Sequence, residues 1–218
     1  MRCIVNHPFN VELINDTLNI ESFKFYIQRD ALFLDDYVRT TLITVSRMKD
    51  YDNIILLTKV AQWSIAANKF LYNRYFTTYS VRHGKKSPVC FNFTNFLLSI
   101  SYSATYEAIT VLYSCMFIYK TVIDDMKRGF KKNNRYKDWF NFYSSYSIES
   151  RCDILENIVH EYCKRVGGNE TSRMLELFRI SAQFELDFWN NTYYFLKCNQ
   201  VSRNIDNFKL VCMLNTYL

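Results

Sequence analysis

The chain has 218 residues, of which 49% are hydrophobic, and its 27 basic and 21 acidic residues give a formal net charge of +6. A chain of this length and apolar content can bury a sizeable core, which excludes an intrinsically disordered protein. Only 4 glycines and 2 prolines are present. Because sheets with tight turns need many of both, this scarcity predicts long helices with few joints. We therefore expect an all-α fold in a single domain over residues 1–218.

The cysteines and the N-terminal segment indicate in which cellular compartment the protein is expected. Seven cysteines stand at irregular spacings without a CxxC pair, which is untypical of a secreted disulfide framework. The opening MRCIVNHPFN lacks the apolar core of a signal peptide. The apolar run at residues 54–57 soon meets Lys59 and Gln62, so it is too short for a membrane span. We expect a cytoplasmic protein with reduced thiols and no membrane partner.

The basic residues are scattered, apart from short clusters at residues 82–86 and 127–135. Both clusters lie where Gly, Asn or Pro interrupts the helical pattern, as in solvated loops. A phosphate or nucleic-acid patch is the alternative interpretation of such clusters. We expect solvated loops and no nucleic-acid partner.

Apolar residues recur at helical spacing from residue 20 onward and predict about seven helices, enough for a closed bundle. Asp52 and Asn53 offer an N-cap to the second helix, and Gly167-Gly168 separate the last two. The final stretch, residues 208–218, is apolar without a clear period. The expected helices cover residues 20–42, 54–71, a segment opened by 93–97, then 105–127, 136–143, 154–166 and 170–196.

Short motifs for cofactor, metal or serine chemistry are missing. The sequence contains no GxGxxG, GxxxxGK[ST], GxSxG or HExxH. Its 3 histidines are His7, His83 and His160, and none belongs to the Glu-x-x-His pair of a helical di-iron site. We therefore expect no catalytic metal, no haem and no other cofactor.

A few polar residues interrupt apolar helices. Cys115 is followed one turn later on the same face by Tyr119, Asp30 interrupts an aromatic segment at residues 23–33, and Glu185 lies among aromatic residues. Burying a carboxylate among apolar side chains is costly unless it is paired or takes part in the function of the protein. Each residue alone also fits an ordinary interpretation, such as an inert buried thiol or a solvated carboxylate. Composition and spacing leave the function open.

Four separated segments form an ordered pattern over residues 7–193, and together this pattern resembles the TenA (thiaminase II) family. The segments are His7-Pro8-Phe9 with Leu18, Phe23, Tyr26 and Asp30; Glu107-Ala108 with Cys115, Phe117 and Tyr119; Tyr136, Trp139 and Tyr143; and Glu185, Phe188 and Trp189.

The resemblance implies a haem-oxygenase-like helical bundle that binds no haem and is often a homotetramer, so we expect a homo-oligomer, either a dimer or a tetramer. It implies a cysteine-dependent hydrolase whose small-molecule substrate is an aminopyrimidine. That substrate is thiamin or its breakdown product 4-amino-5-aminomethyl-2-methylpyrimidine, and the product is the hydroxymethyl pyrimidine used in thiamin salvage.

Site residues follow from the resemblance by position. Cys115 would be the nucleophile that adds to the pyrimidine ring, and Glu185 the acid/base. Asp30 would hold the ring nitrogen and exocyclic amine, while Tyr143 lines the ring with Tyr119 close by. A covalent adduct with proton delivery divides the displacement of a poor leaving amine into two steps. A carboxylate suits an amidine-like edge, and aromatic walls suit a flat heterocycle.

The sequence also departs from the family pattern. Phe33 and Phe93 stand at substrate-binding positions where the family has tyrosines, and Arg29, Ser114 and Ser144-Ser145 replace a Gln, a Pro and a Gly pair. The chain starts close to His-Pro-Phe, so much of the family's first helix is expected to be absent. Each lost hydroxyl would cost about 1 kcal/mol if its partner stays unpaired. Two alternatives stay open: a TenA-like protein that binds a pyrimidine without turnover, and a helical partner-binding protein without a small-molecule site.

Overall fold

The computed structural model describes residues 1–81 and 84–204, and within these ranges every regular element is a helix. This confirms the expected all-α fold; the apolar stretch at 208–218 lies outside the described residues. The elements are α1 (Arg2–Val5), α2 (Pro8–Ile14), α3 (Ile20–Ser46), α4 (Tyr51–Leu71), the π-helical turn η1 (Tyr72–Phe76), α5 (Pro88–Ile100), α6 (Thr105–Met126), α7 (Lys137–Tyr143), α8 (Tyr146–Arg165) and α9 (Gly168–Asn204).

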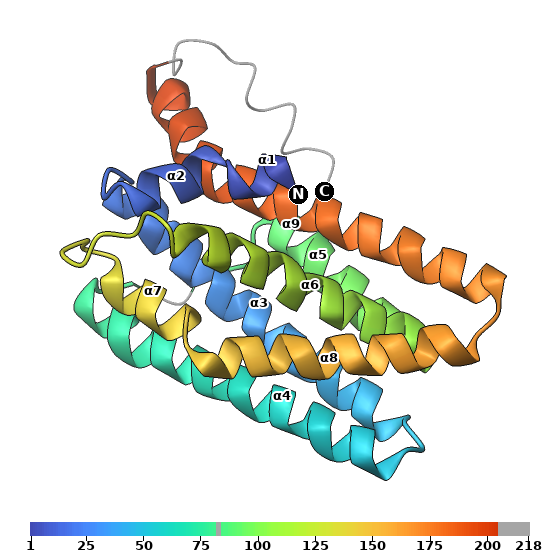
Figure 1. Cartoon of the computed structure of the whole chain (residues 1–218). Coiled ribbons are helices and arrows are strands. Elements are labelled where there is room, and N and C mark those ends of the chain that lie inside the picture. The colour runs from blue at the N-terminus through green and yellow to red at the C-terminus, as the bar shows by residue number, and fades with distance from the viewer. Residues whose placement is uncertain (82–83, 205–218) are drawn as a thin grey trace.

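The helices form a layered bundle (Figure 1). The long α9 runs along the top, with α1 and α2 lying against it, while α4 and α8 lie along the base. Helices α3, α5 and α6 fill the interior, where α6 packs against both α8 and α9, and α3 packs against α4, α5 and α6. Residues on α3, α6 and α9 therefore face one another at the centre.

Helix α3 shows why a polar side chain lies on the helix face that builds the core. The side chain of Asn19 caps the helix by accepting a 2.8 Å hydrogen bond from the Glu21 N–H. Its buried face carries residues three or four apart, as a packed helix requires. Asp30 lies on this face, with Tyr26 one turn and Phe23 two turns before it. The spacing that builds the core thus turns the carboxylate inward.

The predicted helix boundaries need three corrections. Helix α4 is capped by Asp50, whose Oδ1 accepts a 3.0 Å hydrogen bond from the Asn53 N–H, so Asp52 and Asn53 lie inside the helix. Helix α5 begins at Pro88, because Ser87 caps it and proline suits the first helical position. Helix α8 begins at residue 146 rather than 154, since its first turns show little apolar periodicity.

The N-terminal helices α1 and α2 were not predicted, because each is too short to show a period. His7 caps α2 by accepting the Phe9 N–H at 3.2 Å, and Pro8 follows at the first helical position. Phe9 and Leu13 of α2 are fully buried. These helices therefore owe their stability to tertiary packing rather than to their own length.

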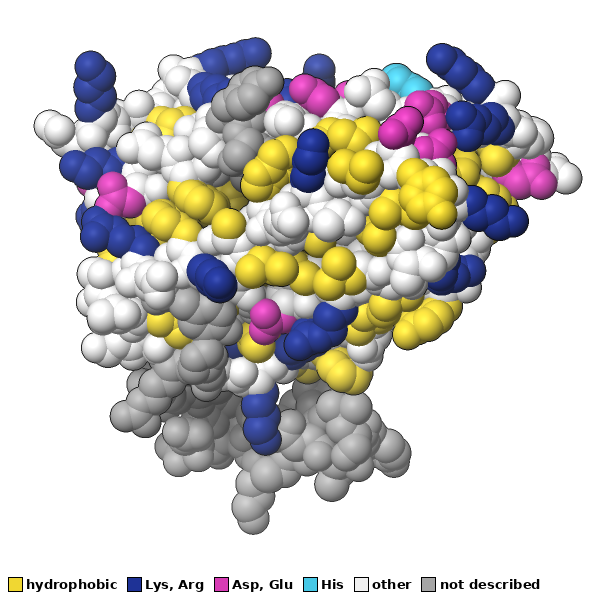
Figure 2. All heavy atoms as spheres, turned by 90° about the horizontal axis from the view of Figure 1, so that it is seen from below, with side chains coloured by type: hydrophobic (Ala, Val, Ile, Leu, Met, Phe, Trp, Pro, Cys, Tyr) yellow, Lys and Arg dark blue, Asp and Glu magenta, His cyan; other side chains and the backbone are white. Residues whose placement is uncertain are grey.

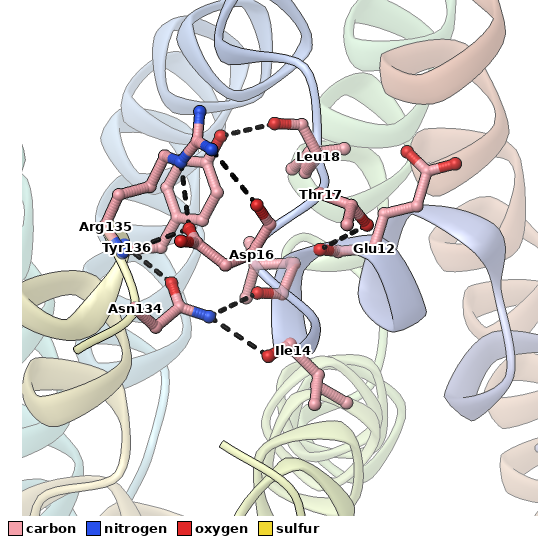
Figure 3. Close-up of polar contacts among 9 residues, drawn as sticks. Glu12, Ile14, Asp16, Thr17, Leu18, Asn134, Arg135 and Tyr136 are labelled. Carbon is pink, nitrogen blue, oxygen red and sulfur yellow. Dashed lines mark hydrogen bonds and ion pairs between the residues drawn. The ribbon is translucent and has the colours of Figure 1, made fainter. Parts of the chain in front are cut away.

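The connection between α6 and α7 is fastened to the end of α2 (Figure 3). The Asn134 side chain donates to the backbone carbonyls of Leu13 at 2.8 Å and Ile14 at 3.1 Å. The next residue, Arg135, forms an ion pair with Asp16 at 2.9 Å. Within the second basic cluster, Arg135 is therefore held by an acid on the N-terminal segment.

The face over α4 has a mixed surface (Figure 2). Lys and Arg side chains are spread singly across it among hydrophobic side chains, and Tyr51 and Ile55 of α4 are exposed. Within residues 1–81 and 84–204, no helix combines the length and apolar character that crossing a membrane requires.

Candidate active site

Two small adjoining cavities lie at the centre of the bundle, with volumes of about 20 and 30 Å³. The two share Asp30, Phe33, Tyr119 and Glu185, which mark their junction. All seven residues that the sequence nominated line one or both cavities: Asp30, Phe33, Phe93, Cys115, Tyr119, Tyr143 and Glu185.

Asp30 of α3 and Glu185 of α9 form the acidic part of the site. Their exposed fractions are 5% and 6%. Burial raises the pKa of Asp30 to about 7, against hydrogen bonds from Tyr143 and Tyr26 that lower it. Burial, with the charge of Asp30, raises the pKa of Glu185 to about 8. Carboxyl groups with a pKa near neutrality can both give and take a proton at physiological pH.

Cys115 of α6 lies beside Glu185. The thiol is 2% exposed, and it interacts with the Glu185 carboxyl. Burial, together with the charge of Glu185, raises the pKa of Cys115 well above its usual value. The thiol is therefore protonated at neutral pH, and it becomes a nucleophile only when a base takes its proton. Glu185 is the base within reach.

Aromatic rings form the walls of the cavities. Phe33 and Phe93 contact each other with ring centroids 5.0 Å apart, and Tyr119 lies 5.0 Å from Tyr143. On the first cavity, Trp189 is stacked 5.4 Å from Tyr26 at an interplanar angle of 9°. Such surfaces suit a flat heterocycle. Because Phe33 and Phe93 carry no hydroxyl, the wall that they form is apolar.

The hydroxyls near Asp30 form a short network. Tyr143 donates to Asp30 Oδ2 at 2.7 Å, and Tyr26 also hydrogen-bonds Asp30. The hydroxyls of Tyr26 and Tyr119 are hydrogen-bonded to each other. The Asp30 carboxylate is thus held by Tyr26 of α3 and Tyr143 of α7. Tyr119 of α6 joins this network through its hydrogen bond with Tyr26.

Seven further residues line the cavities without having been nominated: Tyr26, Leu34, Ala67, Met116, Arg151, Phe188 and Trp189. Tyr26 precedes Asp30 by four residues and Trp189 follows Glu185 by four, so helical spacing already put each on the same face as its carboxylate. Arg151 had no such signal, because it precedes the start expected for α8.

The histidines lie away from this site. His7 is paired with Asn190 at 3.2 Å, and His160 is exposed, while His83 lies outside the described residues. Within the part of the chain that the structure describes, no group of three or more His, Cys, Asp or Glu side chains is placed to hold a metal ion.

Comparison with known proteins places the chain in a family. The sequence of residues 1–194 matches the TENA/THI-4/PQQC family. The aminopyrimidine aminohydrolase of Halalkalibacterium halodurans is 19% identical over 196 residues, which cover 86% of this chain and 88% of the relative. The aminopyrimidine aminohydrolase of Bacillus subtilis is 21% identical over 193 residues, which cover 86% and 82%.

Solved structures agree on the fold. A TenA homologue from Pyrococcus furiosus superposes with a TM-score of 0.84 at 21% identity, covering 88% of this chain and 93% of that one. The TenA homologue of P. horikoshii OT3 gives a TM-score of 0.77 at 23% identity, covering 88% and 92%. With a family match that extends from the first residue to residue 194, the chain belongs to the TENA/THI-4/PQQC family.

Proposed function

We propose that this protein is a cysteine-dependent hydrolase of aminopyrimidines, of the thiaminase II type, that acts in thiamin salvage. The observation that carries the proposal is the convergence of Cys115, Glu185 and Asp30, from three different helices, on two adjoining cavities with aromatic walls. Relatives named aminopyrimidine aminohydrolase that align with most of the chain support it.

The arrangement suits a two-step displacement. Asp30 hydrogen-bonds the ring nitrogen and exocyclic amine, which places the ring between the aromatic walls. Glu185 takes the proton of Cys115, and the thiolate adds to the ring. Glu185 then gives that proton to the leaving amine, which departs from the methylene substituent.

Water completes the cycle. Glu185 takes a proton from water as the hydroxyl adds to the methylene carbon, and the ring releases the thiolate, which regains its proton from Glu185. The balance is an aminomethyl pyrimidine plus water giving a hydroxymethyl pyrimidine plus ammonia. A pKa of about 8 for Glu185 suits a group that must act as acid and base in turn.

The test is an assay of amine release from two substrates, 4-amino-5-aminomethyl-2-methylpyrimidine (ammonia) and thiamin (thiazole). Cys115→Ser should lower kcat by about 10²-fold or more, because a hydroxyl is a far weaker nucleophile than a thiolate. Cys90→Ser is the matched control, since Cys90 is equally buried but lies outside the lining of both cavities. Equal turnover by the wild type and Cys115→Ser would show that Cys115 is not the nucleophile.

A second candidate is a protein that binds a pyrimidine without hydrolysing it. The apolar wall of Phe33 and Phe93 favours it, because hydroxyls that would orient the substrate are missing there. Calorimetry separates the two functions: tight binding of hydroxymethyl pyrimidine, with no hydrolysis of any aminopyrimidine, would support the binding protein. A partner-binding protein without a small-molecule site would show no thermal shift with any pyrimidine.

The expected homo-oligomer, a dimer or tetramer, stays a prediction. Light scattering of the purified chain would measure its mass in solution.

A further inference from the structure

Arg151, near the N-terminal end of α8, places a guanidinium in the wall of the second cavity. The residue is only 2% exposed. Among the described residues that line this cavity, Arg151 is the one cation. Burial lowers the pKa of Arg151, yet a guanidinium is basic enough to keep its charge at neutral pH.

Asp30 and Glu185 line both cavities, whereas Arg151 lines the second and not the first. The charge of Arg151 acts on the hydroxyls of Tyr37 and Tyr143. The pKa values of the two acids respond instead to burial, to the tyrosines, to Cys115 and, for Glu185, to Asp30. Among the described residues, the second cavity is therefore lined by two acids and one cation.

Cys115 lines the second cavity as well. If the amidine edge of the ring is held by Asp30, the group displaced near Cys115 shares the second cavity with Arg151. Leu34, Ala67 and Met116 also line this cavity. Because Arg151 is only 2% exposed, a charge on a leaving group beside the guanidinium would be weakly screened by solvent.

Resting on the proposed function, we infer that Arg151 is a specificity-determining residue that selects aminopyrimidines whose leaving group carries an acidic substituent, a carboxylate or a phosphate. The planar guanidinium presents paired N–H donors that match either oxyanion. A neutral leaving group of the same size forfeits this interaction. The selectivity would appear as a ratio of kcat/KM values between matched substrates.

Two pairs of substrates test the inference and show whether the preferred acidic group is a phosphate or a carboxylate. Thiamin and thiamin monophosphate differ by one phosphate on the leaving group. For the carboxylate, N-carboxymethyl and N-propyl derivatives of 4-amino-5-aminomethyl-2-methylpyrimidine form a size-matched pair. We expect the wild type to favour the acidic member of at least one pair by about tenfold or more in kcat/KM, as for a hydrogen bond to a charged group.

Variants then assign the preference to Arg151. In Arg151→Gln the ratio should fall to about one, and in Arg151→Lys, which keeps a charge without the planar pair of donors, it should be intermediate. Arg179→Gln, at an exposed position of α9, should keep the wild-type ratio. Thermal melting of each variant checks that it is folded. The kcat/KM ratios of the wild type test the preference for acidic substrates even if a variant does not fold.

The outcomes separate this inference from the function on which it rests. Hydrolysis of both members of each pair with equal kcat/KM, or a preference that Arg151→Gln leaves intact, would overturn the role of Arg151 while leaving the hydrolase in place. If the wild type hydrolyses neither these four compounds nor 4-amino-5-aminomethyl-2-methylpyrimidine itself, the proposed function fails. Calorimetry with the same pairs would still decide the role of Arg151, because equal affinity for acidic and neutral members would refute it.

Discussion

The hydroxyl of Tyr143 on α7 donates a 2.7 Å hydrogen bond to Oδ2 of Asp30 on α3, between two side chains that are each 5% exposed. Burial disfavours the charged form of Asp30, and this bond favours it. The pKa of about 7 is the result of that opposition. Tyr143 thus helps Asp30 to be ionised at the pH at which it would bind an aminopyrimidine.

Tyr143→Phe should move the acidic limb of the kcat/KM profile to higher pH. Removing a donor that stabilises the carboxylate raises the pKa of Asp30, so a higher pH is needed to ionise it. Activity should recover above this limb. A pH–rate series from about pH 5.5 to 9 measures the change, with Tyr102→Phe as the control because Tyr102 is 68% exposed. An acidic limb that stays in place would contradict the role given to the bond.

Glu185→Gln should lower kcat by about 10²-fold or more, because the shape of the side chain is kept and proton transfer is lost. Pyrimidine binding should be nearly intact, as Asp30 makes the contacts to the ring edge. Steady-state kinetics with calorimetry would measure both effects. Asp187→Asn on the same helix is the control, since Asp187 hydrogen-bonds Gln183 away from the cavities. A near-normal kcat with an unchanged pH profile would exclude Glu185 as the acid/base.

Stability should fall as the pH rises through the neutral range. Asp30 and Glu185 have folded-state pKa values raised from 3.8 to about 7 and from 4.5 to about 8. Between about pH 4 and pH 8, the folded state therefore binds more protons than the unfolded state, and the free energy of unfolding decreases with pH. Their contribution is fully present below about pH 4 and is lost once both groups are ionised.

Urea unfolding at several pH values from about 5 to 8.5 measures this dependence. Other groups titrate in the same range, so the comparison is with the double variant Asp30→Asn, Glu185→Gln. The difference between the two curves isolates the buried acids, and the variant should gain relative to the wild type as the pH rises. Parallel curves would mean that these carboxyls are not desolvated in the folded protein.

Asn134→Ala should destabilise the fold by about 2–3 kcal/mol, because it leaves buried backbone carbonyls without donors. Asn134 donates to Leu13 and Ile14, and its Oδ1 accepts the Tyr136 N–H at 2.8 Å (Figure 3). Urea unfolding measures the loss, and the exposed neighbour Asn133→Ala should change stability by less than about 0.5 kcal/mol. Equal stability of the two variants would refute the fastening role of Asn134.

Much of the helical framework follows from local periodicity in the sequence. The spacing of apolar residues located α3, α4, α6 and α9 because each is long enough to show which face is buried. The same spacing put Asp30, Cys115 and Glu185 on inward faces. Ordered motifs then nominated seven side chains, and all of them line the two cavities.

Other features depend on contacts between distant segments, which periodicity does not report. Helices α1 and α2 are too short to form by themselves, and α2 exists because Phe9 and Leu13 are buried against the bundle. Arg151 enters the cavity only because α8 starts earlier than its apolar pattern and packs against α6. The raised pKa values of Asp30 and Glu185 likewise arise from desolvation by side chains of several helices. Burial and charge proximity are properties of the assembled bundle, so the protonation behaviour of the site emerges only when the helices come together.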